Sequence, residues 1–318
     1  MITISTKINP ESISQGAKII RDGGLVAFPT ETVYGLGANA LNPEAVRKIY
    51  EAKGRPSDNP LILHVSSFDQ ASELVYMNDI GEKLIAKFWP GPLTLVLPAK
   101  EIVPLSTRGG LETAAIRMPD NPVAQALIKT SGVPIAAPSA NISGRPSPTD
   151  FESVYNDMNG KIEMILDGGK VDVGIESTVI DVTNPERVLM LRPGGMPREL
   201  IEKTLNAKLY FPDDVSKKRS PGTRYKHYAP NIPVIIWHKD KPFPEINNSA
   251  YIGLHDVDEK YDEKIIFSDV KSYAQGLFAG FRKLETRKVS CIIVEWPEGD
   301  SGVSEGLRDR ISRAAGEK

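Results

Sequence analysis

Short apolar runs alternate with amphipathic segments through the first 205 residues, and this alternation limits the possible folds more than any other feature of the chain. Runs such as 25–28 and 93–97 are short and bounded by glycine or proline, as buried strands are. Segments such as 11–21 and 79–88 repeat apolar residues at helical spacing. Strands that alternate with helices predict an α/β fold. Two apolar runs within 177–191 predict an antiparallel hairpin, and therefore a mixed sheet.

The pattern changes after residue 205, which divides the chain into three predicted parts. We predict an α/β domain over residues 1–205 and a small Rossmann-like α/β domain over residues 232–318. The residues between them, 206–231, lack an apolar period and are rich in lysine, arginine and tyrosine, which predicts a basic linker. The small domain contains no cluster of carboxylates, hydroxyls or histidines that would indicate chemistry of its own. We therefore expect the functional residues in the first domain and the linker.

The composition excludes several classes of protein and site. A net charge of −2 over 318 residues gives no reason to expect a general nucleic-acid binder, so any basic site must be local. The single cysteine, Cys291, excludes an internal disulfide and a metal site of several thiolates, and the four histidines are scattered. No secretory signal precedes Asn9, and no apolar run approaches the ~20 residues that span a bilayer, so we expect a cytoplasmic protein.

Residues 53–64, KGRPSDNPLILH, contain the strongest local candidate for a site. Lys53 and Arg55 lie on a predicted turn, directly before an apolar run that ends in His64. Fixed cations on a turn beside a strand end suit an anionic ligand such as a nucleotide phosphate. On the residues alone, a solvated basic loop and a buried core histidine explain the stretch about equally well.

Two further stretches contain small residues that are typical of nucleotide-binding loops. The spacing Gly35-x-Gly37-x-x-Ala40 is compatible with a dinucleotide-binding turn, but no acidic residue closes the next strand, where a ribose-binding carboxylate would lie. We therefore reject that interpretation. Residues 138–144 combine small hydroxyl and amide side chains, which leave backbone N–H groups open to phosphate oxygens. A plain connecting loop explains their composition at least as well.

Six stretches, in order along the chain, together resemble one protein family. They are PTETVYGLG at 29–37, KGRP at 53–56, PSANISGRPSPT at 138–149, ESTVID at 176–181, SPGTRYKHYAP at 220–230 and GLRDRISRAA at 306–315. On these motifs the chain resembles the YrdC-type threonylcarbamoyl-AMP synthases, and the last two stretches resemble the two-domain branch of that family. The resemblance implies an open, twisted mixed sheet around a concave, positively charged cavity.

The resemblance also implies a reaction. The family makes L-threonylcarbamoyladenylate from L-threonine, bicarbonate and ATP, and releases pyrophosphate, so the chain is expected to be a nucleotidyltransferase. Mg²⁺ is expected to accompany ATP and to be held mainly through the phosphates, without a metal site in the protein. The product is expected to pass to a tRNA threonylcarbamoyl-transfer complex, which modifies the adenosine next to the anticodon. Such a reaction needs fixed cations and positioning more than an acid or base of unusual pKa.

Residue roles follow from the same resemblance. Lys53 and Arg55 are expected to face the ATP phosphates as the catalytic pair. The expected nucleotide-binding residues are Arg55, Asn59, Thr113, Ser139, Ser147, Arg192 and Tyr228. The residues expected around L-threonine are Thr32, His64, Arg117, the backbone of Ala137, and Ser177. Arg117 suits the carboxylate of threonine because a guanidinium binds carboxylate in bidentate fashion. Asn141 and Ser143 are additional candidates for phosphate contacts.

The linker is expected to act as a lid. Residues 220–230 contain Arg224, Lys226 and His227, which can meet phosphates, and tyrosines that can stack or hydrogen-bond. We expect them to close over the cavity when ATP is bound, with the small domain as the anchor of their far end. Thr223 departs from the bulkier apolar residue expected in relatives.

Two other classes of function are considered. A double-stranded RNA-binding translation factor without catalysis would use the basic concavity of a YrdC-like domain, but the balanced charge and the threonine-site residues argue against it. A carbamoyl transferase for hydrogenase maturation would contain zinc-finger cysteines, and this chain has one cysteine. Stabilisation of the protein by ATP plus threonine would separate a synthase from a pure RNA binder.

Overall fold

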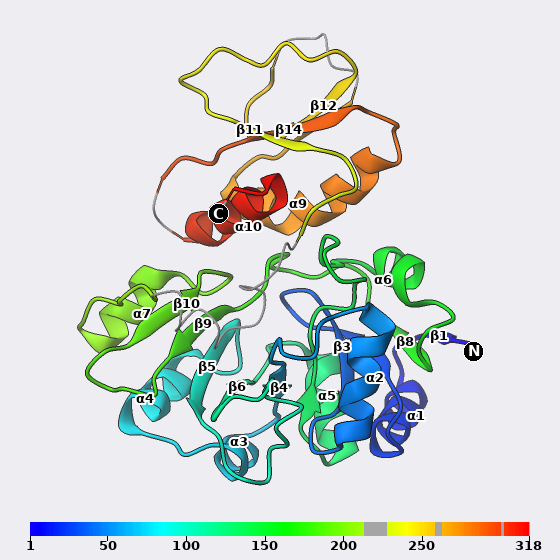
Figure 1. Cartoon of the computed structure of the whole chain (residues 1–318), viewed down its shortest axis with the longest axis vertical. Coiled ribbons are helices and arrows are strands. Elements are labelled where there is room, and N and C mark those ends of the chain that lie inside the picture. Colours follow the sequence, from blue (N-terminus) through cyan, green and yellow to red (C-terminus); the bar gives the residue numbers. More distant parts are fainter. Residues whose placement is uncertain (213–227, 258–262, 300–301, 318) are drawn as a thin grey trace.

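The structure, a computed structural model, describes residues 1–212, 228–257, 263–299 and 302–317. Two α/β units are stacked along the long axis of the molecule (Figure 1). The larger unit contains a ten-stranded sheet and the smaller unit a four-stranded sheet. Within the described residues, no helix has the length and apolar character needed to cross a membrane.

The ten-stranded sheet of the larger unit is mixed, as the sequence predicts. Its strands are β1 (Ile4–Lys7), β2 (Val26–Pro29), β3 (Tyr34–Asn39), β4 (Ile62–His64), β5 (Leu93–Pro98), β6 (Thr113–Arg117), β7 (Ile135–Ala136), β8 (Met164–Asp167), β9 (Thr178–Asp181) and β10 (Leu189–Arg192). Their spatial order is β1-β8-β2-β3-β7-β4-β6-β5-β9-β10. The sheet contains parallel pairs such as β4 with β6 and antiparallel pairs such as β5 with β6. The hairpin predicted within 177–191 is confirmed, because β9 and β10 pair antiparallel.

Helices cover this sheet, and their ends follow from the sequence. They are α1 (Pro10–Arg21), α2 (Pro43–Lys53), α3 (Phe68–Leu74), α4 (Asp79–Phe88), α5 (Pro122–Ser131), α6 (Phe151–Met158) and α7 (Arg198–Leu205). Three of them begin with Asn-Pro: the side chains of Asn9, Asn42 and Asn121 accept hydrogen bonds from the first-turn N–H groups, and proline fits the first helical position. Gly54 ends α2 in the left-handed conformation, with φ of 61°.

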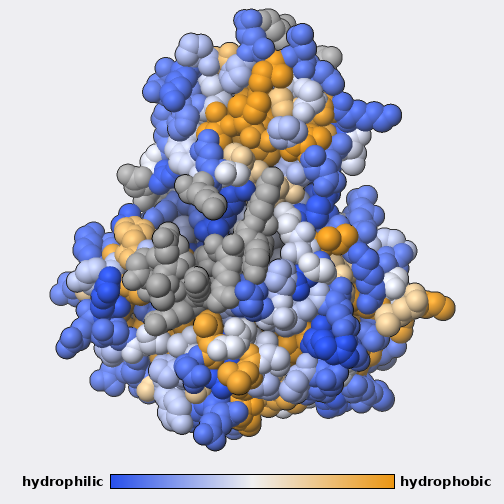
Figure 2. All heavy atoms as spheres, viewed as in Figure 1, coloured by the Kyte–Doolittle hydropathy of each residue, from blue (hydrophilic) through white to orange (hydrophobic). Residues whose placement is uncertain are grey.

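The smaller unit is a parallel sheet with its helices on one face. Its strands are β11 (Val234–Trp237), β12 (Ser249–Gly253), β13 (Lys264–Ile266) and β14 (Cys291–Glu295), in the order β11-β14-β12-β13. The helices α9 (Val270–Glu285) and α10 (Ser304–Ala315) lie between this sheet and the larger unit (Figure 1). Apolar residues gather over the sheet of the smaller unit, whereas the larger unit is mostly hydrophilic on the same side (Figure 2).

The two units share apolar and charged contacts. One buried apolar cluster joins Val33 and Ile175 of the larger unit to residues of α9 and α10 such as Phe278 and Leu307. Around this cluster, Arg145 binds Glu285 through two hydrogen bonds of 2.6 Å. The units are therefore packed against each other through α9 and α10, near the centre of the molecule.

Several elements were not expected from the sequence. β1, α3 and α6 are short, and α3, FDQASEL, has few apolar residues to reveal its period. The stretch with Gly35 and Gly37 is the strand β3, and not a dinucleotide-binding loop. A Cβ at Gly37 would lie 2.7 Å from the ring of Phe28 and 2.8 Å from Ile135, so this glycine permits close packing on the sheet face. The rejection of the dinucleotide interpretation is consistent with this strand.

Candidate active site

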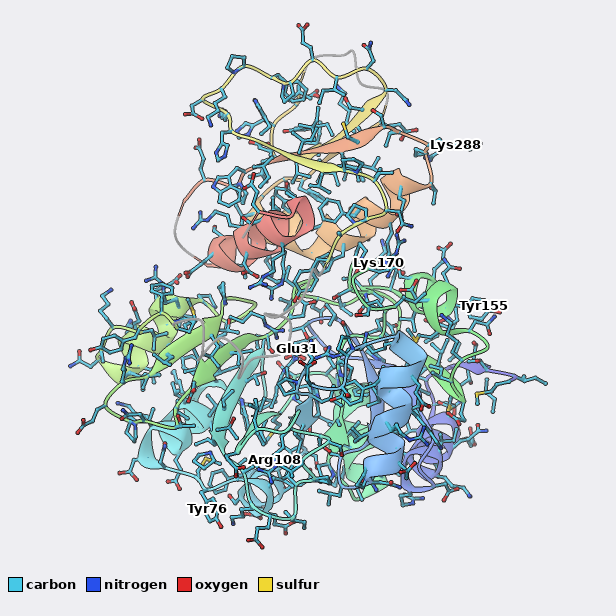
Figure 3. The ribbon with its side chains drawn as sticks, in the orientation of Figure 1. Glu31, Tyr76, Arg108, Tyr155, Lys170 and Lys288 are labelled. Carbon is cyan, nitrogen blue, oxygen red and sulfur yellow. The ribbon has the colours of Figure 1, made fainter. Side chains whose placement is uncertain are left out.

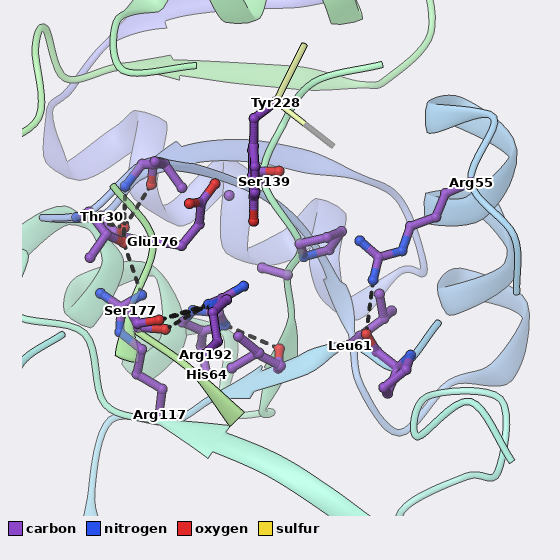
Figure 4. A pocket seen from close by; sticks show the side chains of 17 residues that line it. Thr30, Arg55, Leu61, His64, Arg117, Ser139, Glu176, Ser177, Arg192 and Tyr228 are labelled. Atoms are coloured by element: carbon purple, nitrogen blue, oxygen red, sulfur yellow. Dashed lines mark hydrogen bonds between the residues drawn. The ribbon is translucent and has the colours of Figure 1, made fainter. Parts of the chain in front are cut away.

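A pocket opens between the strand ends of the larger unit and Tyr228, close to the smaller unit (Figure 4). Its empty space, including the part open to solvent, is about 580 Å³, within the usual range of small-molecule sites. The five residues proposed around threonine all line this pocket: Thr32, His64, Arg117, Ala137 and Ser177. Four of those proposed for the nucleotide also line it: Arg55, Ser139, Arg192 and Tyr228. The structure thus brings together residues that lie far apart in the sequence.

The turn between β2 and β3 forms one wall of the pocket. The Thr30 hydroxyl holds this turn: it donates to the carbonyl of Val33 at 2.7 Å and lies 2.8 Å from the hydroxyl of Thr32. Arg117, at the end of β6, donates to the Thr32 hydroxyl at 3.0 Å and forms a 2.6 Å ion pair with Glu31. Glu31 lies near the centre of the molecule, toward the smaller unit (Figure 3). One buried cation is thus matched by one buried carboxylate.

His64 ends β4 beside Arg117 and is 3% exposed. Burial, and then the charge of Arg117, lower the pKa of His64 to about 3. Its Nδ1 lies 3.2 Å from the carbonyl oxygen of Ile62, which can only accept, so Nδ1 carries the proton. The ring is therefore neutral near pH 7, and Nε2 is a hydrogen-bond acceptor. His64 can accept a bond from a ligand hydroxyl or amine, but it adds no charge to the pocket.

Arg192, at the end of β10, lies across the middle of the pocket (Figure 4). Its Nη2 donates to the carbonyl of Ser177 at 2.9 Å and to the hydroxyl of Ser177 at 3.2 Å. The Ser177 hydroxyl is in turn 2.7 Å from that of Thr94 on β5. Burial lowers the pKa of Arg192. These contacts fix a guanidinium inside the pocket before any ligand binds.

Arg55 lies on the turn that follows α2, opposite Arg117 in the pocket (Figure 4). Its Nη2 donates to the carbonyl of Pro60 at 3.0 Å. Its Nε is buried and has no hydrogen-bond acceptor among the described residues. Burial lowers its pKa to about 10, so the side chain stays cationic at neutral pH. A buried donor without a protein acceptor, on a pocket wall, suits an anionic ligand.

Lys53 does not line the pocket. Its ammonium donates to the carbonyls of Ser139 at 2.6 Å and Asn141 at 2.5 Å, and the side chain is 2% exposed. Burial lowers the pKa of Lys53 well below its usual value. Its observed partners place it beneath the loop that follows β7. The contact between Lys53 and ATP phosphates stays a prediction.

Five other proposed residues do not line the pocket; one of them, Ser143, donates its N–H to the carbonyl of Lys53 at 2.8 Å. Asn59 is fully buried, and its amide has no hydrogen-bond partner in the described part of the chain. Thr113 is the first residue of β6. Ser147 donates to Glu176 at 2.5 Å, and Asn141 accepts from the Ser139 hydroxyl at 2.5 Å. Ser147 and Asn141 therefore contact residues that line the pocket.

Tyr228 comes from the chain that joins the two units and closes one side of the pocket. Its ring stacks on Phe278 of α9, with centroids 5.4 Å apart, and it is 4% exposed. Burial raises the pKa of Tyr228. Residues 213–227 lie outside the described part of the chain. Most of the expected lid, residues 220–227 with Thr223, Arg224, Tyr225, Lys226 and His227, is therefore outside the described residues.

Sequence reasoning missed two charged residues of this region. Glu176 lines the pocket and is buried. Its carboxylate accepts a 2.6 Å hydrogen bond from Nε of Arg310, which comes from α10 of the smaller unit. Arg310 follows Leu307 by three residues on the buried face of α10. A cation at an apolar position of an amphipathic helix is the signal that could have indicated a buried partner.

Comparisons with known proteins cover nearly the whole chain. Residues 18–194 match the Sua5/YciO/YrdC family, which is described as telomere recombination. Residues 196–316 match the threonylcarbamoyl-AMP synthase C-terminal domain. The threonylcarbamoyl-AMP synthase of Pyrococcus abyssi is 44% identical over 99% of this chain and 97% of its own length. That of Bacillus subtilis is 44% identical over 99% of this chain and 96% of its own length.

Solved structures show the same similarity. The crystal structure of P. abyssi Sua5 complexed with L-threonine matches with a TM-score of 0.90 at 43% identity, over 99% of this chain and 97% of the other. E. coli YciO matches 61% of this chain and 94% of its own, with a TM-score of 0.54 at 25% identity. Full-length HypF, in a phosphate- and nucleotide-bound form, shares the fold alone: its TM-score is 0.52 at 21% identity, over 58% of this chain and 30% of the other.

Proposed function

The chain belongs to the Sua5/YciO/YrdC family of threonylcarbamoyl-AMP synthases, and on this premise we propose that it makes L-threonylcarbamoyladenylate from L-threonine, bicarbonate and ATP, with release of pyrophosphate. It is accordingly a nucleotidyltransferase that serves tRNA modification. The single observation that carries the proposal is one buried pocket whose lining offers fixed guanidinium groups, hydroxyls and a neutral imidazole, in a chain similar to these enzymes along its full length. The noncatalytic RNA-binding alternative has no comparable support.

We assign ATP to the side of the pocket that contains Arg55, Ser139, Arg192 and Tyr228. Arg55 is a half-buried cation whose buried Nε has no acceptor in the described chain, which suits a phosphate oxygen. Arg192 would face a second part of the triphosphate. Lys53 would support the phosphate site through the backbone of the loop at 139–141, whose carbonyls its ammonium binds. Asn59, Thr113 and Ser147 are retained as proposed neighbours of the nucleotide.

Mg²⁺ is proposed to enter as the Mg–ATP complex. Among the described residues, no group of three His, Cys, Asp or Glu side chains could hold a metal ion. The carboxylate on the pocket lining, Glu176, already accepts hydrogen bonds from Ser147 and Arg310. The ion would therefore be held mainly by phosphate oxygens, where it neutralises the leaving pyrophosphate.

We assign L-threonine to the opposite side, where Thr32, His64, Arg117, Ala137 and Ser177 meet. The Arg117 guanidinium would bind both Glu31 and the threonine carboxylate. Neutral His64 would accept a hydrogen bond from the threonine hydroxyl or amine through Nε2. The Ala137 N–H donates to the Ile62 carbonyl at 2.9 Å, so a contact from this residue would come from its carbonyl oxygen.

The chemistry then requires little beyond positioning. The threonine amine attacks the carbon of bicarbonate, whose hydroxyl leaves with an amine proton as water, and an oxygen of the resulting carbamate attacks the α-phosphorus of ATP. The bond from that phosphorus to the bridging oxygen breaks, and pyrophosphate leaves with the electron pair. Both reactants are anions, so fixed guanidinium groups between the two sides, above all Arg192, lower the repulsion between them. Neither Arg192 nor Arg55 has to transfer a proton in this scheme.

We further propose that the product passes to a tRNA threonylcarbamoyl-transfer complex in the cytoplasm. We also retain the division of the chain into a catalytic domain over 1–205, a joining segment over 206–231 and a small α/β domain over 232–318. The two matched family regions, which meet between residues 194 and 196, support a division near this place.

The test is pyrophosphate release by the full chain. Each of L-threonine, bicarbonate and ATP is omitted in turn, and we expect every omission to abolish release. Release of orthophosphate, or release that does not need threonine, would contradict the proposed reaction.

A further inference from the structure

Arg310 of the smaller unit is buried at the edge of the active-site pocket, although it comes from the last helix of the chain. It is 0% exposed, and it is the largest of the fully buried side chains. Its Nε donates to Oε2 of Glu176 at 2.6 Å, and its Nη1 donates to the carbonyl of Pro193 at 3.0 Å and to Asp309 at 2.5 Å. The guanidinium carbon also lies 5.2 Å from the centre of the Tyr228 ring. Arg310 therefore touches two residues that line the pocket, Glu176 and Tyr228.

Glycines on both sides allow α10 to come this close. A Cβ at Gly306 of α10 would lie 2.9 Å from Cα of Gly194, and a Cβ at Gly194 would lie 2.3 Å from the carbonyl oxygen of Glu176. A larger residue at Gly306 would push α10 away from Gly194, and a larger residue at Gly194 would push that segment away from the loop before β9 that carries Glu176. The close approach of helix and pocket wall is thus built into the sequence of both units.

The Glu176 carboxylate is the negative charge on the pocket lining, and both of its oxygens are held. Oε1 accepts from the Ser147 hydroxyl at 2.5 Å, and Oε2 accepts from Arg310. Burial raises the pKa of Glu176, but the charges of Arg310 and Arg192 outweigh burial and lower it, so the group is ionised near pH 7. Without the cation of Arg310, this buried charge would repel a triphosphate and attract Arg192 toward itself.

We propose that Arg310 is a positioning residue of the active site, which neutralises Glu176 and so keeps the nucleotide side of the pocket suited to a polyanion. The inference rests on the assignment of ATP to this pocket. It makes the smaller unit a structural part of the nucleotide site, and not only the anchor of a linker. Arg310 acts through Glu176 and Tyr228, and it need not touch ATP itself.

The test compares Arg310→Met with the double variant Arg310→Met/Glu176→Gln in the full chain. The single variant leaves a buried carboxylate without its cation, so we expect the KM for ATP to rise by about tenfold or more, with a smaller change in the KM for threonine. The double variant removes the charge as well, so its KM for ATP should return to within about threefold of the wild type. A role in packing alone would leave the double variant at least as impaired as the single one.

Glu305→Gln is the matched control. Glu305 lies on the same helix and pairs with Arg198 of the larger unit at 3.1 Å, away from the pocket lining. Its loss should leave the KM for ATP unchanged. If Arg310→Met does not fold, as thermal unfolding will show, Arg310→Lys takes its place, because it keeps the cation and loses part of the guanidinium contacts. We then expect a KM for ATP that is raised only a few-fold, because the lysine ammonium still neutralises Glu176; a rise of tenfold or more would contradict the role of this charge.

The outcomes also separate this inference from the proposed function. No pyrophosphate release by the wild type would overturn the proposed function. Wild-type release together with an unchanged KM for ATP in the Arg310 variant, or with no recovery in the double variant, would overturn the role of Arg310 alone.

Discussion

The two sides of the pocket differ in how their charge is balanced. On the side assigned to threonine, Arg117 and Glu31 pair at 2.6 Å, and His64 is neutral because burial lowers its pKa to about 3. On the side assigned to ATP, Arg192 is a buried cation and Arg55 a half-buried one, and the carboxylate of Glu176 is paired with Arg310. A nearly neutral site suits a zwitterionic amino acid, and a cationic site suits a triphosphate. The two sides should therefore respond differently to the loss of a charge.

The sides also differ in where their residues come from. Thr32, His64, Arg117 and Ser177 are all residues of the larger unit and lie on or near its sheet. The side assigned to ATP includes Tyr228, which stacks on α9, and Glu176, which pairs with Arg310 of α10. Threonine binding should thus depend on the larger unit, whereas ATP binding should depend on both units.

The largest expected effect concerns the side assigned to threonine, where Arg117 and Glu31 balance each other's charge. Arg117→Met would leave Glu31 buried without its cation, so we expect the free energy of unfolding to fall by about 3–5 kcal/mol and threonine-dependent turnover to be lost. Urea denaturation measures the first effect and pyrophosphate release the second. Adding Glu31→Gln should recover most of the stability without restoring turnover. If Arg117→Met were as stable as the wild type, the buried charge of Glu31 would not depend on Arg117 for its neutralisation.

The next effect concerns the side assigned to ATP, which is cationic. Arg55 donates to backbone carbonyls and forms no ion pair among the described residues, so Arg55→Ala should change stability less than Arg117→Met does. We expect the KM for ATP to rise by about tenfold or more, and Arg55→Lys to recover only part of it, since a planar guanidinium becomes a point charge. Steady-state kinetics at limiting ATP measure this. Wild-type turnover of Arg55→Ala under those conditions would remove Arg55 from the phosphate site.

The preference for threonine over serine tests how closely the pocket encloses the amino acid on the side assigned to threonine. Serine lacks the methyl group of threonine, and such a group in a compact pocket contributes about 1–3 kcal/mol to discrimination. We therefore expect serine to be used with a kcat/KM roughly 10–200-fold lower than that of threonine. Competition between the two amino acids in one reaction, followed by mass analysis of the adenylates, gives the ratio directly. Equal use of both would mean that the pocket does not enclose the methyl group.

The last prediction concerns pH and a single neutral residue of the side assigned to threonine. The pKa of His64 is about 3 in the folded protein, against about 6.5 for an unperturbed histidine, so the unfolded chain binds a proton that the folded chain does not over this range. The contribution of His64 should therefore lower stability as the pH falls below about 6.5, by up to about 1.4 kcal/mol per pH unit. Urea denaturation at pH 7 and pH 5 should show a smaller loss for His64→Gln. An equal loss in both proteins would place a charged His64 in the folded state.

Much of the site could be predicted because its residues lie in short motifs. Arg55, in KGRP, and Ser177, in ESTVID, line the pocket as residues of recognisable stretches. Their roles with ATP and threonine stay predictions. The mixed sheet followed from the alternation of strands and helices, whose local signals are strong.

Other features depend on contacts between distant residues and could not be predicted. From the sequence, Lys53 is predicted to contact an anionic ligand. In the structure its ammonium donates to the carbonyls of Ser139 and Asn141, which are more than eighty residues away in the sequence. Glu176 and Arg310 are separated by 134 residues, and the sequence does not show that α10 approaches the pocket. The strand β3 was missed because its glycines are required by packing against Phe28, which only the assembled sheet reveals.

One measurement tests the central claim most directly. The full chain is incubated with ATP, L-threonine and ¹³C-labelled bicarbonate, and the adenylate product is identified by mass spectrometry. This distinguishes the proposed product from a simple threonyl adenylate, whose formation would also release pyrophosphate. We predict L-threonylcarbamoyladenylate with the label in its carbamoyl carbon. A threonyl adenylate without that carbon, or no adenylate at all, would contradict the account.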